Sequence, residues 1–375
     1  MPGLLPNVDP EGLLEYSVVY TDRALNHMSA KFQHVMRDVS GLLKSVYAAR
    51  SAIVVPGSGT FGMEAVARQF ATGKTALVLR NGWFSYRWSQ IFQMGAIPSR
   101  EIVLKARLTD AAPQSPFAPV AIEEAVATIE RERPDVVFAP HVETASGMIL
   151  PEAYLKRVAQ AVRQVDGLFV VDCVASGAIW LDMAALGIEV LISAPQKSWS
   201  SSPCGALVML GERARDRIER TQSTSFACDL RKWLQVMETY ESGAHMYHAT
   251  LPTDALVGLR DRMLEARALG FDALRDAQWQ LGRRSRAALE RAGFRSVAAE
   301  GFQAPGVVVS YTSDPDISTG KKFVPLGLQI AAGVPLQCDE PADYRAFRLG
   351  LFGLDKLQNV DRSVATLEAA LARLG

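Results

Sequence analysis

Residues 190–203 of the chain read VLISAPQKSWSSSP. The apolar run from Val190 to Ala194 is short and is followed by turn residues, a pattern typical of a buried strand. Lys197 follows that strand, where a lysine is rare because burying an ammonium group costs free energy. A lysine held there can have a lowered pKa, which favours Schiff-base formation with a carbonyl group. A lysine that simply reaches solvent from a loop is the alternative at this point.

The sequence before and around this stretch repeats the same kind of pattern. Short apolar runs alternate with helical patterns, which predicts βαβ units and a mainly parallel sheet covered on both faces. We therefore expect residues 21–255 to form one large α/β domain. The apolar runs are residues 52–55, 76–79, 135–139, 168–171, 189–193 and 206–210, and the helical patterns are residues 63–70, 88–95 and 152–165.

The pattern changes after residue 253 and predicts a smaller C-terminal α/β domain over residues 256–375. Residues 1–20 are expected to be an N-terminal extension. The elements predicted for the second domain are helices at 253–270, 271–293, 319–331 and 360–374 and strands at 306–311 and 347–352.

Composition limits the class of protein. Hydrophobic residues make up 49% of the 375 residues, and Lys+Arg and Asp+Glu number 40 each. We thus expect a folded protein without a charge bias toward nucleic acid or anionic membrane. No apolar stretch approaches the ~18 residues of a membrane span, and residues 1–6 do not resemble a secretory signal. The cysteines are widely spaced, which disfavours metal clusters and a disulfide framework and favours a cytoplasmic location. They are Cys173, Cys204, Cys228 and Cys338.

A glycine-containing turn follows the strand predicted at 52–55. It reads PGSGT, residues 56–60, and leads into a helix. Free N–H groups at a helix start attract a phosphate, and Ser58 and Thr60 can add hydroxyl donors beside Gly59. The turn matches neither a P-loop nor a full dinucleotide motif, and a plain strand-to-helix turn is the alternative.

Three further strand ends carry unusual side chains. Asp172 ends the strand 168–171. A buried carboxylate there requires a positive partner, and a protonated pyridine nitrogen would provide one. A structural ion pair or a helix cap is the alternative. Thr144 lies in the polar stretch 141–147 and can donate to a ring hydroxyl. Trp83 and Phe84 follow the strand 76–79, where one of them can stack on a planar ring or pack between domains.

Together these features predict a site for pyridoxal 5′-phosphate (PLP). Ligands of open parallel sheets bind beyond the carboxyl ends of the strands, and all of these residues are expected there. A phosphate turn, an aromatic ring, a carboxylate for a ring nitrogen and a Schiff-base lysine follow one another at successive strand ends.

The segment DCVAS at 172–176, followed by SAPQK at 193–197, resembles the class V aminotransferases, with the strongest likeness to the alanine–glyoxylate and serine–pyruvate aminotransferase branch. The resemblance implies fold type I of the PLP-dependent transferases and transfer of an amino group between an amino acid and a 2-oxo acid. Lys197 would form the internal aldimine and act as general base and acid. The amino group would pass through pyridoxamine phosphate.

The resemblance also assigns roles by position. Asp172 would hold the pyridine N–H, Thr144 the 3′-hydroxyl, and Gln196 the phosphate or the ring hydroxyl. Phe84 would stack on the ring, with Trp83 as its competitor. Ser58, Gly59 and Thr60 would bind the phosphate, Tyr247 and Thr250 would reach the neighbour's phosphate in a homodimer, and Arg348 would bind the substrate carboxylate.

One segment departs from the family pattern. Members usually open with a Pro-Gly-Pro stretch that lines the substrate pocket, whereas residues 15–29 here read EYSVVYTDRALNHMS. The sequence thus leaves the amino donor and acceptor open, glyoxylate included.

Three alternatives remain. A cysteine desulfurase or β-lyase of the same fold would need a reactive thiol such as Cys338, whose acidic neighbours Asp339 and Glu340 raise rather than lower a thiol pKa. A nicotinamide dehydrogenase or nucleotide-binding module would leave Lys197 and Asp172 without a role. A non-catalytic PLP-binding protein would leave Arg348 without one.

Overall fold

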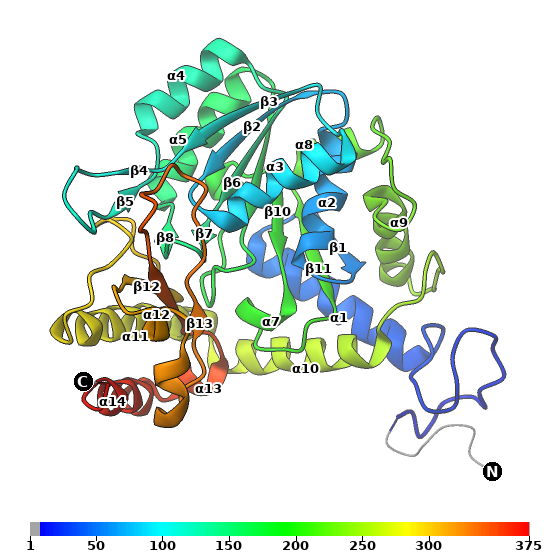
Figure 1. Ribbon diagram of the computed structural model, residues 1–375. Coiled ribbons are helices and arrows are strands. Elements are labelled where there is room, and N and C mark those ends of the chain that lie inside the picture. The colour runs from blue at the N-terminus through cyan, green and yellow to red at the C-terminus, as the bar shows by residue number, and fades with distance from the viewer. Residues whose placement is uncertain (1–7, 375) are drawn as a thin grey trace.

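The structure, a computed structural model, describes residues 8–374, so residues 1–7 of the predicted N-terminal extension lie outside the described residues. A seven-stranded sheet with the order β1-β11-β10-β9-β6-β2-β3 forms its centre (Figure 1). The strands are β1 (Ser51–Pro56), β2 (Thr75–Arg80), β3 (Arg100–Lys105), β6 (Val136–Pro140), β9 (Leu168–Asp172), β10 (Val190–Ser193) and β11 (Gly205–Leu210).

The sheet is mainly parallel, as predicted. Strands β3, β2, β6, β9 and β10 run parallel, and only β11 is antiparallel to both of its neighbours, β10 and β1. Every residue of β6, β9, β10 and β11 is buried, so both faces of the central sheet are covered. Because parallel strands end at one edge, the chain segments that follow them meet there.

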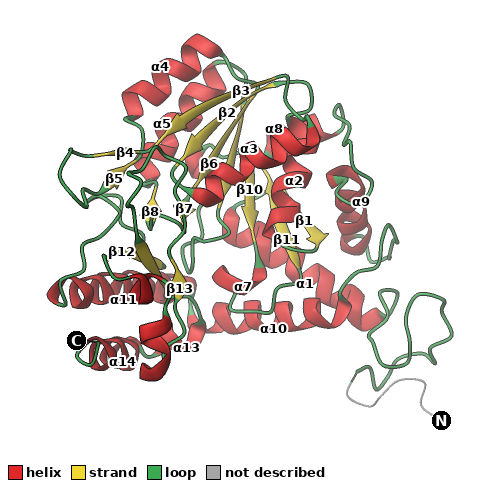
Figure 2. Ribbon diagram, in the orientation of Figure 1, coloured by secondary structure: helices red, strands yellow, loops and turns green. Residues whose placement is uncertain are grey.

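Helices and two short hairpins surround this sheet (Figure 2). The helices are α1 (Ala30–Tyr47), α2 (Gly59–Phe70), α3 (Trp83–Gly95), α4 (Ile122–Glu132), α5 (Glu152–Gln164), α6 (Met183–Leu186), α7 (Pro195–Ser198), α8 (Glu212–Ile218), α9 (Leu230–Glu241) and α10 (Thr253–Leu269). The hairpins are β4 (Arg107–Leu108) with β5 (Phe117–Ala118), and β7 (Val142–Glu143) with β8 (Met148–Ile149). A Cβ at Gly62 would lie 2.4 Å from Ala206 Cβ, so α2 can pack this closely on β11 only with glycine there. Among the described residues no helix is long and apolar enough to cross a membrane.

A second, smaller lobe has its own sheet, of order β12-β14-β13, and its own apolar core. Its elements are α11 (Phe271–Arg291), β12 (Val307–Tyr311), α12 (Pro315–Ser318), the 3-10 helix η1 (Lys321–Leu326), β13 (Ala331–Ala332), β14 (Ala346–Gly350), α13 (Leu354–Gln358) and α14 (Val360–Leu371). The predicted helix at 319–331 is wrong, because only the short η1 forms there. Gly320 and Gly327 flank η1 with φ of 82° and 79°, left-handed values that end a helix at both sides.

Helix α10 joins the two lobes. Leu256, Leu259 and Met263 belong to the core around the large sheet, whereas Ala266 belongs to the core of the small lobe. The predicted boundary at residue 255 stays a prediction, since the side chains of α10 divide between the two cores.

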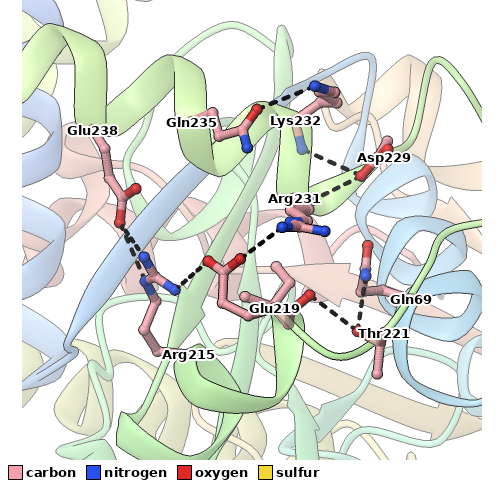
Figure 3. A network of polar contacts seen from close by, with 10 residues as sticks. Gln69, Arg215, Glu219, Thr221, Asp229, Arg231, Lys232, Gln235 and Glu238 are labelled. Atoms are coloured by element: carbon pink, nitrogen blue, oxygen red, sulfur yellow. Dashed lines mark hydrogen bonds and ion pairs between the residues drawn. The ribbon is translucent and has the colours of Figure 1, made fainter.

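A polar network on the surface fixes α9 beside α8 and α2 (Figure 3). Arg215 contacts Glu219 at 2.7 Å and Glu238 at 2.9 Å, and Arg231 contacts the other oxygen of Glu219 at 3.0 Å. Each exposed pair contributes at most about 1 kcal/mol, so the network orients α9 more than it stabilises the fold. The loop after α9 carries Tyr247 and Thr250.

Candidate active site

Lys197 lies in the short helix α7, directly after β10 at the carboxyl edge of the sheet. Pro195 occupies the start of α7, where its fixed φ suits a first helical residue. The Lys197 Nζ atom lies 5.8 Å from the centroid of the Phe84 ring and 5.8 Å from that of the Phe352 ring. The amine is therefore placed between an aromatic ring from each lobe.

The electrostatic surroundings of Lys197 favour a neutral amine. Burial lowers its pKa, and the positive charges of Arg348 and Arg87 act in the same direction. The carboxylates Asp172 and Glu143 oppose this effect. A lowered pKa increases the fraction of neutral amine, the form that attacks a carbonyl or accepts a proton.

Asp172 ends β9, in register with Ile192 of β10. Its side chain is buried, and its Oδ1 atom accepts a hydrogen bond from Val174 N at 2.9 Å. Burial raises the pKa of this carboxyl to about 6, although the nearby Lys197 charge opposes the shift. A cation bound beside it would stabilise the charged form, and the protonated nitrogen of a pyridine ring is such a cation.

Phe84 faces the site, whereas Trp83 does not. The Phe84 ring centroid lies 5.6 Å from Arg348 Cζ and 5.0 Å from Arg87 Cζ, in addition to its contact with Lys197. The Trp83 ring instead packs on Tyr86, with centroids 5.6 Å apart. Of the two aromatic candidates, the geometry supports Phe84 as the stacking residue.

Glu143, which sequence reasoning did not assign to the site, holds Phe84 in place. Its carboxylate is fully buried and accepts hydrogen bonds from Phe84 N at 3.2 Å and from Ser85 N at 2.8 Å, so it caps the N-terminus of α3. A Cβ at Gly82 would lie 2.8 Å from Glu143 Cγ, so only glycine permits this approach. The sequence shows Glu143 at a strand end, but nothing in it pairs this residue with Phe84.

The predicted phosphate turn lies at the N-terminus of α2. Ser58 is the N-cap residue, yet its hydroxyl makes no capping bond. Gly59 is buried, and a Cβ there would lie 2.8 Å from Val174 Cγ2, next to Asp172. Thr60 Oγ1 accepts a hydrogen bond from Arg87 Nη1 at 2.9 Å. Phe61 N already donates to Ser58 O at 2.9 Å, so the N–H groups of Gly59 and Thr60 and the two hydroxyls are what this turn offers to a ligand.

Other predicted residues lie at the same edge with fewer contacts. The Gln196 Oε1 atom is buried and has no hydrogen-bond partner among the described residues, as expected of a group that meets a ligand. Thr144 is half-buried in the turn between β7 and β8. His141 is buried with its Nδ1 2.7 Å from Ser176 Oγ, and burial lowers its pKa to about 3, which leaves it a neutral structural residue.

Arg348 reaches the site from β14 of the small lobe. Its Nε donates to the carbonyl of Ala332 at 2.7 Å, which orients the guanidinium. Burial lowers the pKa of Arg348, and the Glu143 charge opposes that shift. An arginine facing Phe84 and Lys197 can bind a carboxylate through two parallel hydrogen bonds.

Tyr247 and Thr250 are not brought to the site within one chain. The Tyr247 hydroxyl lies 3.2 Å from Thr250 Oγ1, and the Tyr247 ring packs on His27 of the N-terminal segment. The Tyr247 side chain is half exposed, at 51%. Both residues belong to the α9–α10 loop, away from α7 in Figure 1.

Cys338 does not have the properties of a catalytic thiol. It is buried, its Sγ donates to the carbonyl of Arg80 at 3.4 Å, and burial raises its pKa to about 12. The thiolate that a desulfurase needs is therefore disfavoured. Within residues 8–374 no cluster of three or more His, Cys, Asp or Glu side chains could hold a metal ion.

Comparison with known proteins gives one family. The family model described as Aminotransferase class-V matches residues 13–312. The chain is 27% identical over 369 residues to a 2-aminoethylphosphonate–pyruvate transaminase of Paraburkholderia phymatum, covering 94% of this chain and 90% of that protein. It is also 24% identical over 356 residues to a protein of Synechococcus sp. named soluble hydrogenase, small subunit, covering 94% and 88%.

The fold is that of solved aminotransferases. The crystal structure of an alanine–glyoxylate aminotransferase from Nostoc sp. matches with a TM-score of 0.76 at 21% identity, covering 92% of this chain and 88% of that one. This likeness confirms the fold type I prediction. The uncapped N-terminus of α2 fits the phosphate of PLP, and the buried carboxyl of Asp172 fits its protonated ring nitrogen. The unpartnered Gln196 oxygen is an acceptor and fits the ring hydroxyl, which can donate to it. The chain belongs to the class-V aminotransferases and is a PLP-dependent transaminating enzyme.

Proposed function

We propose that Lys197 is the residue to which PLP binds and that it transfers the proton during transamination between an amino acid and a 2-oxo acid. The observation that carries this proposal is the half-buried amine of Lys197, between Phe84 and Phe352 and close to the Asp172 charge. Bound PLP supplies an electron sink that lets the proton on the substrate α-carbon leave. An amine of lowered pKa suits both removal and return of that proton.

The other residues would bind and orient the cofactor. Asp172 would pair with the ring nitrogen, Phe84 would stack on the ring, and Thr144 would donate to the ring hydroxyl. The phosphate would meet the N-terminus of α2, where Ser58, Gly59 and Thr60 lie, and Gln196 would meet the phosphate or the ring hydroxyl.

Arg348 would bind the substrate carboxylate. Its guanidinium faces the same aromatic ring as the lysine amine, so a bound α-carboxylate places the α-carbon near Lys197. A 2-oxo acid acceptor is supported by the names of similar proteins, which include pyruvate or glyoxylate.

The test is substitution of the lysine. Lys197→Ala should lose the visible absorbance of the purified protein and all transamination, whereas Lys321→Ala, at an exposed lysine of η1, should keep both. Absorbance spectra and conversion of a panel of amino acids with pyruvate measure the two properties. A yellow and active Lys197→Ala protein would contradict the proposal.

We also propose that two copies of the chain complete each site, with Tyr247 and Thr250 reaching the phosphate bound by the partner. The N-terminal segment supports their loop, because Tyr20 Oη donates to Leu251 O at 3.0 Å and Leu25 N to Asp254 Oδ1 at 3.1 Å.

Large apolar side chains are exposed on the same segments, which supports an interface there. Leu13, Tyr16 and Val18 of the N-terminal segment are 90%, 89% and 102% exposed. Phe226 is 76% exposed and packs on His248, beside Tyr247. Sedimentation at increasing protein concentration tests for the dimer, and a protein that stays monomeric when loaded with PLP would contradict it.

A cytoplasmic location is proposed as well. It is supported by the four cysteines, all of which lie within the described residues and carry free, buried thiols. Accumulation of a tagged protein outside the cytoplasm would contradict this location.

A further inference from the structure

Arg87 is a charged side chain of the site that the roles above do not use. It lies on α3, three residues after Phe84, with its Cζ 5.0 Å from the centroid of the Phe84 ring. Its Nη1 donates to Thr60 Oγ1 at 2.9 Å, so the guanidinium reaches from the ring that faces Lys197 to the first turn of α2.

Arg87 is a half-buried cation beside the N-terminus of α2. The N-terminus of a helix carries a partial positive charge, and α2 has no side-chain cap there. Among residues 8–374 Arg87 forms no ion pair with a carboxylate, and its one side-chain hydrogen bond is to a neutral hydroxyl. A cation placed beside a helix N-terminus indicates a site for an anion.

The carboxylates of the site do not supply this anion. Glu143 is occupied by the N-terminus of α3 and by Ala145 N at 2.9 Å. Asp172 accepts from Val174 N and lies beside the Lys197 charge. Arg87 therefore has no counter-ion among the carboxylates of the site, and a phosphate group at the N-terminus of α2 would supply one.

We propose that Arg87 binds the phosphate group of the cofactor, either directly or by orienting Thr60 toward it, and so makes the protein select PLP over pyridoxal. This inference rests on the proposed function, because it assumes that PLP occupies the site around Lys197. A guanidinium fits a phosphate through a fork of N–H donors, which a single lysine ammonium does not provide.

The test compares binding of two cofactors that differ only in the phosphate. PLP and pyridoxal are each titrated into cofactor-free protein, and tryptophan fluorescence gives the dissociation constants. Arg87→Gln should weaken PLP binding by about 10- to 100-fold, the effect of one charge-assisted hydrogen-bonding group, and pyridoxal binding by less than about threefold. Arg68→Gln on α2, an arginine paired with Glu64, is the matched control and should change neither constant.

Inorganic phosphate provides a second measurement. It should strengthen pyridoxal binding to the wild-type protein by occupying the phosphate position, and it should lose this effect in Arg87→Gln. Equal weakening of PLP and pyridoxal binding by Arg87→Gln, or unchanged PLP binding, would overturn the inference.

Two further outcomes are distinguishable. If circular dichroism shows that Arg87→Gln does not fold, Arg87→Lys is titrated with the same two cofactors. We expect an intermediate loss of affinity for PLP and none for pyridoxal. An equal loss of affinity for both cofactors would overturn the inference. If the wild-type protein binds neither cofactor, the proposed function fails rather than the role of Arg87 alone.

Discussion

At the scale of single residues, Asp172 is buried at a position where its ionised carboxylate is unfavourable without a bound cation. Its carboxyl is 8% exposed, and burial raises its pKa from 3.8 to about 6. The folded protein therefore binds more protons than the unfolded chain between about pH 4 and pH 6, and ionisation of Asp172 destabilises the cofactor-free protein as the pH rises through that range. A shift of this size corresponds to about 3 kcal/mol at most.

Asp172→Asn should therefore stabilise the cofactor-free protein near neutral pH, by up to about 3 kcal/mol, with the difference vanishing near pH 4. The amide oxygen of Asn can still accept the Val174 N–H bond. Urea unfolding at several pH values measures the effect, and Asp272→Asn at an exposed carboxylate is the control. The same variant should lose about 100-fold or more in turnover, because a neutral amide cannot pair with a ring cation. A less stable Asp172→Asn protein at neutral pH would contradict this account of its pKa.

Arg348 allows a test of substrate binding. Arg348→Lys should raise KM for amino acids by about 10- to 100-fold, because the fork that binds a carboxylate through two hydrogen bonds is lost. An amine without a carboxylate should react equally with both proteins. The measurement is the rate of the half-reaction with each amine, and an equal loss for both amines would show that Arg348 does not bind the carboxylate.

The sequence was sufficient to predict residues whose position along a strand reveals them. Lys197 and Asp172 each follow an apolar run, and Arg348 was assigned through the family resemblance. The structure brings all three together with Phe84. Glu143 and Arg87 could not be predicted in this way, because their importance depends on contacts with Phe84 and Thr60 from distant segments.

At the scale of elements, the N-terminus of α3 depends on a contact with a residue that is distant in the sequence. Apolar periodicity predicted a helix at 88–95, yet α3 begins at Trp83, because the Glu143 carboxylate caps its first turn. The predicted helix at 319–331 is wrong because local residues interrupt it. Apolar residues continue through this region, but Pro325 lacks an N–H donor and the flanking glycines adopt left-handed φ values.

Glu143→Gln should destabilise the protein by about 2–4 kcal/mol, because the amide NH₂ replaces an acceptor that buried N–H groups require. The expected readout is a lower urea midpoint, together with weaker PLP binding as Phe84 moves. Glu123→Gln is the control, because Glu123 is an exposed carboxylate on α4 that pairs with Arg157 of α5. This substitution should leave the urea midpoint nearly unchanged. If Glu143→Gln has the wild-type midpoint, the carboxylate does not hold α3.

At the scale of the whole molecule, each site of the proposed dimer takes residues from two chains. A double variant, Tyr247→Phe with Thr250→Val, should bind PLP weakly as a homodimer, and Lys197→Ala should be inactive. After subunit exchange between the two proteins, some dimers pair an intact Lys197 with an intact Tyr247 and Thr250 from the partner. Activity should then exceed that of either protein alone, and no gain on exchange would contradict the shared site.

The small lobe contributes side chains to the surroundings of Lys197. Phe352 and Arg348 come from that lobe, and Ser200 Oγ, three residues after Lys197, accepts a hydrogen bond from Leu354 N at 3.1 Å. Sequence periodicity predicted both lobes, but it gave no information on this contact, which joins residues 154 positions apart.

Lys197 is proposed to form the covalent bond to the cofactor, and chemical trapping of that bond identifies the lysine. The PLP-loaded protein is reduced with borohydride, digested and analysed by mass spectrometry. We expect the peptide that contains Lys197 to carry the added mass of a phosphopyridoxyl group and the other lysines to remain unmodified. A phosphopyridoxyl group on a different lysine, with Lys197 unmodified, would contradict the assignment of Lys197.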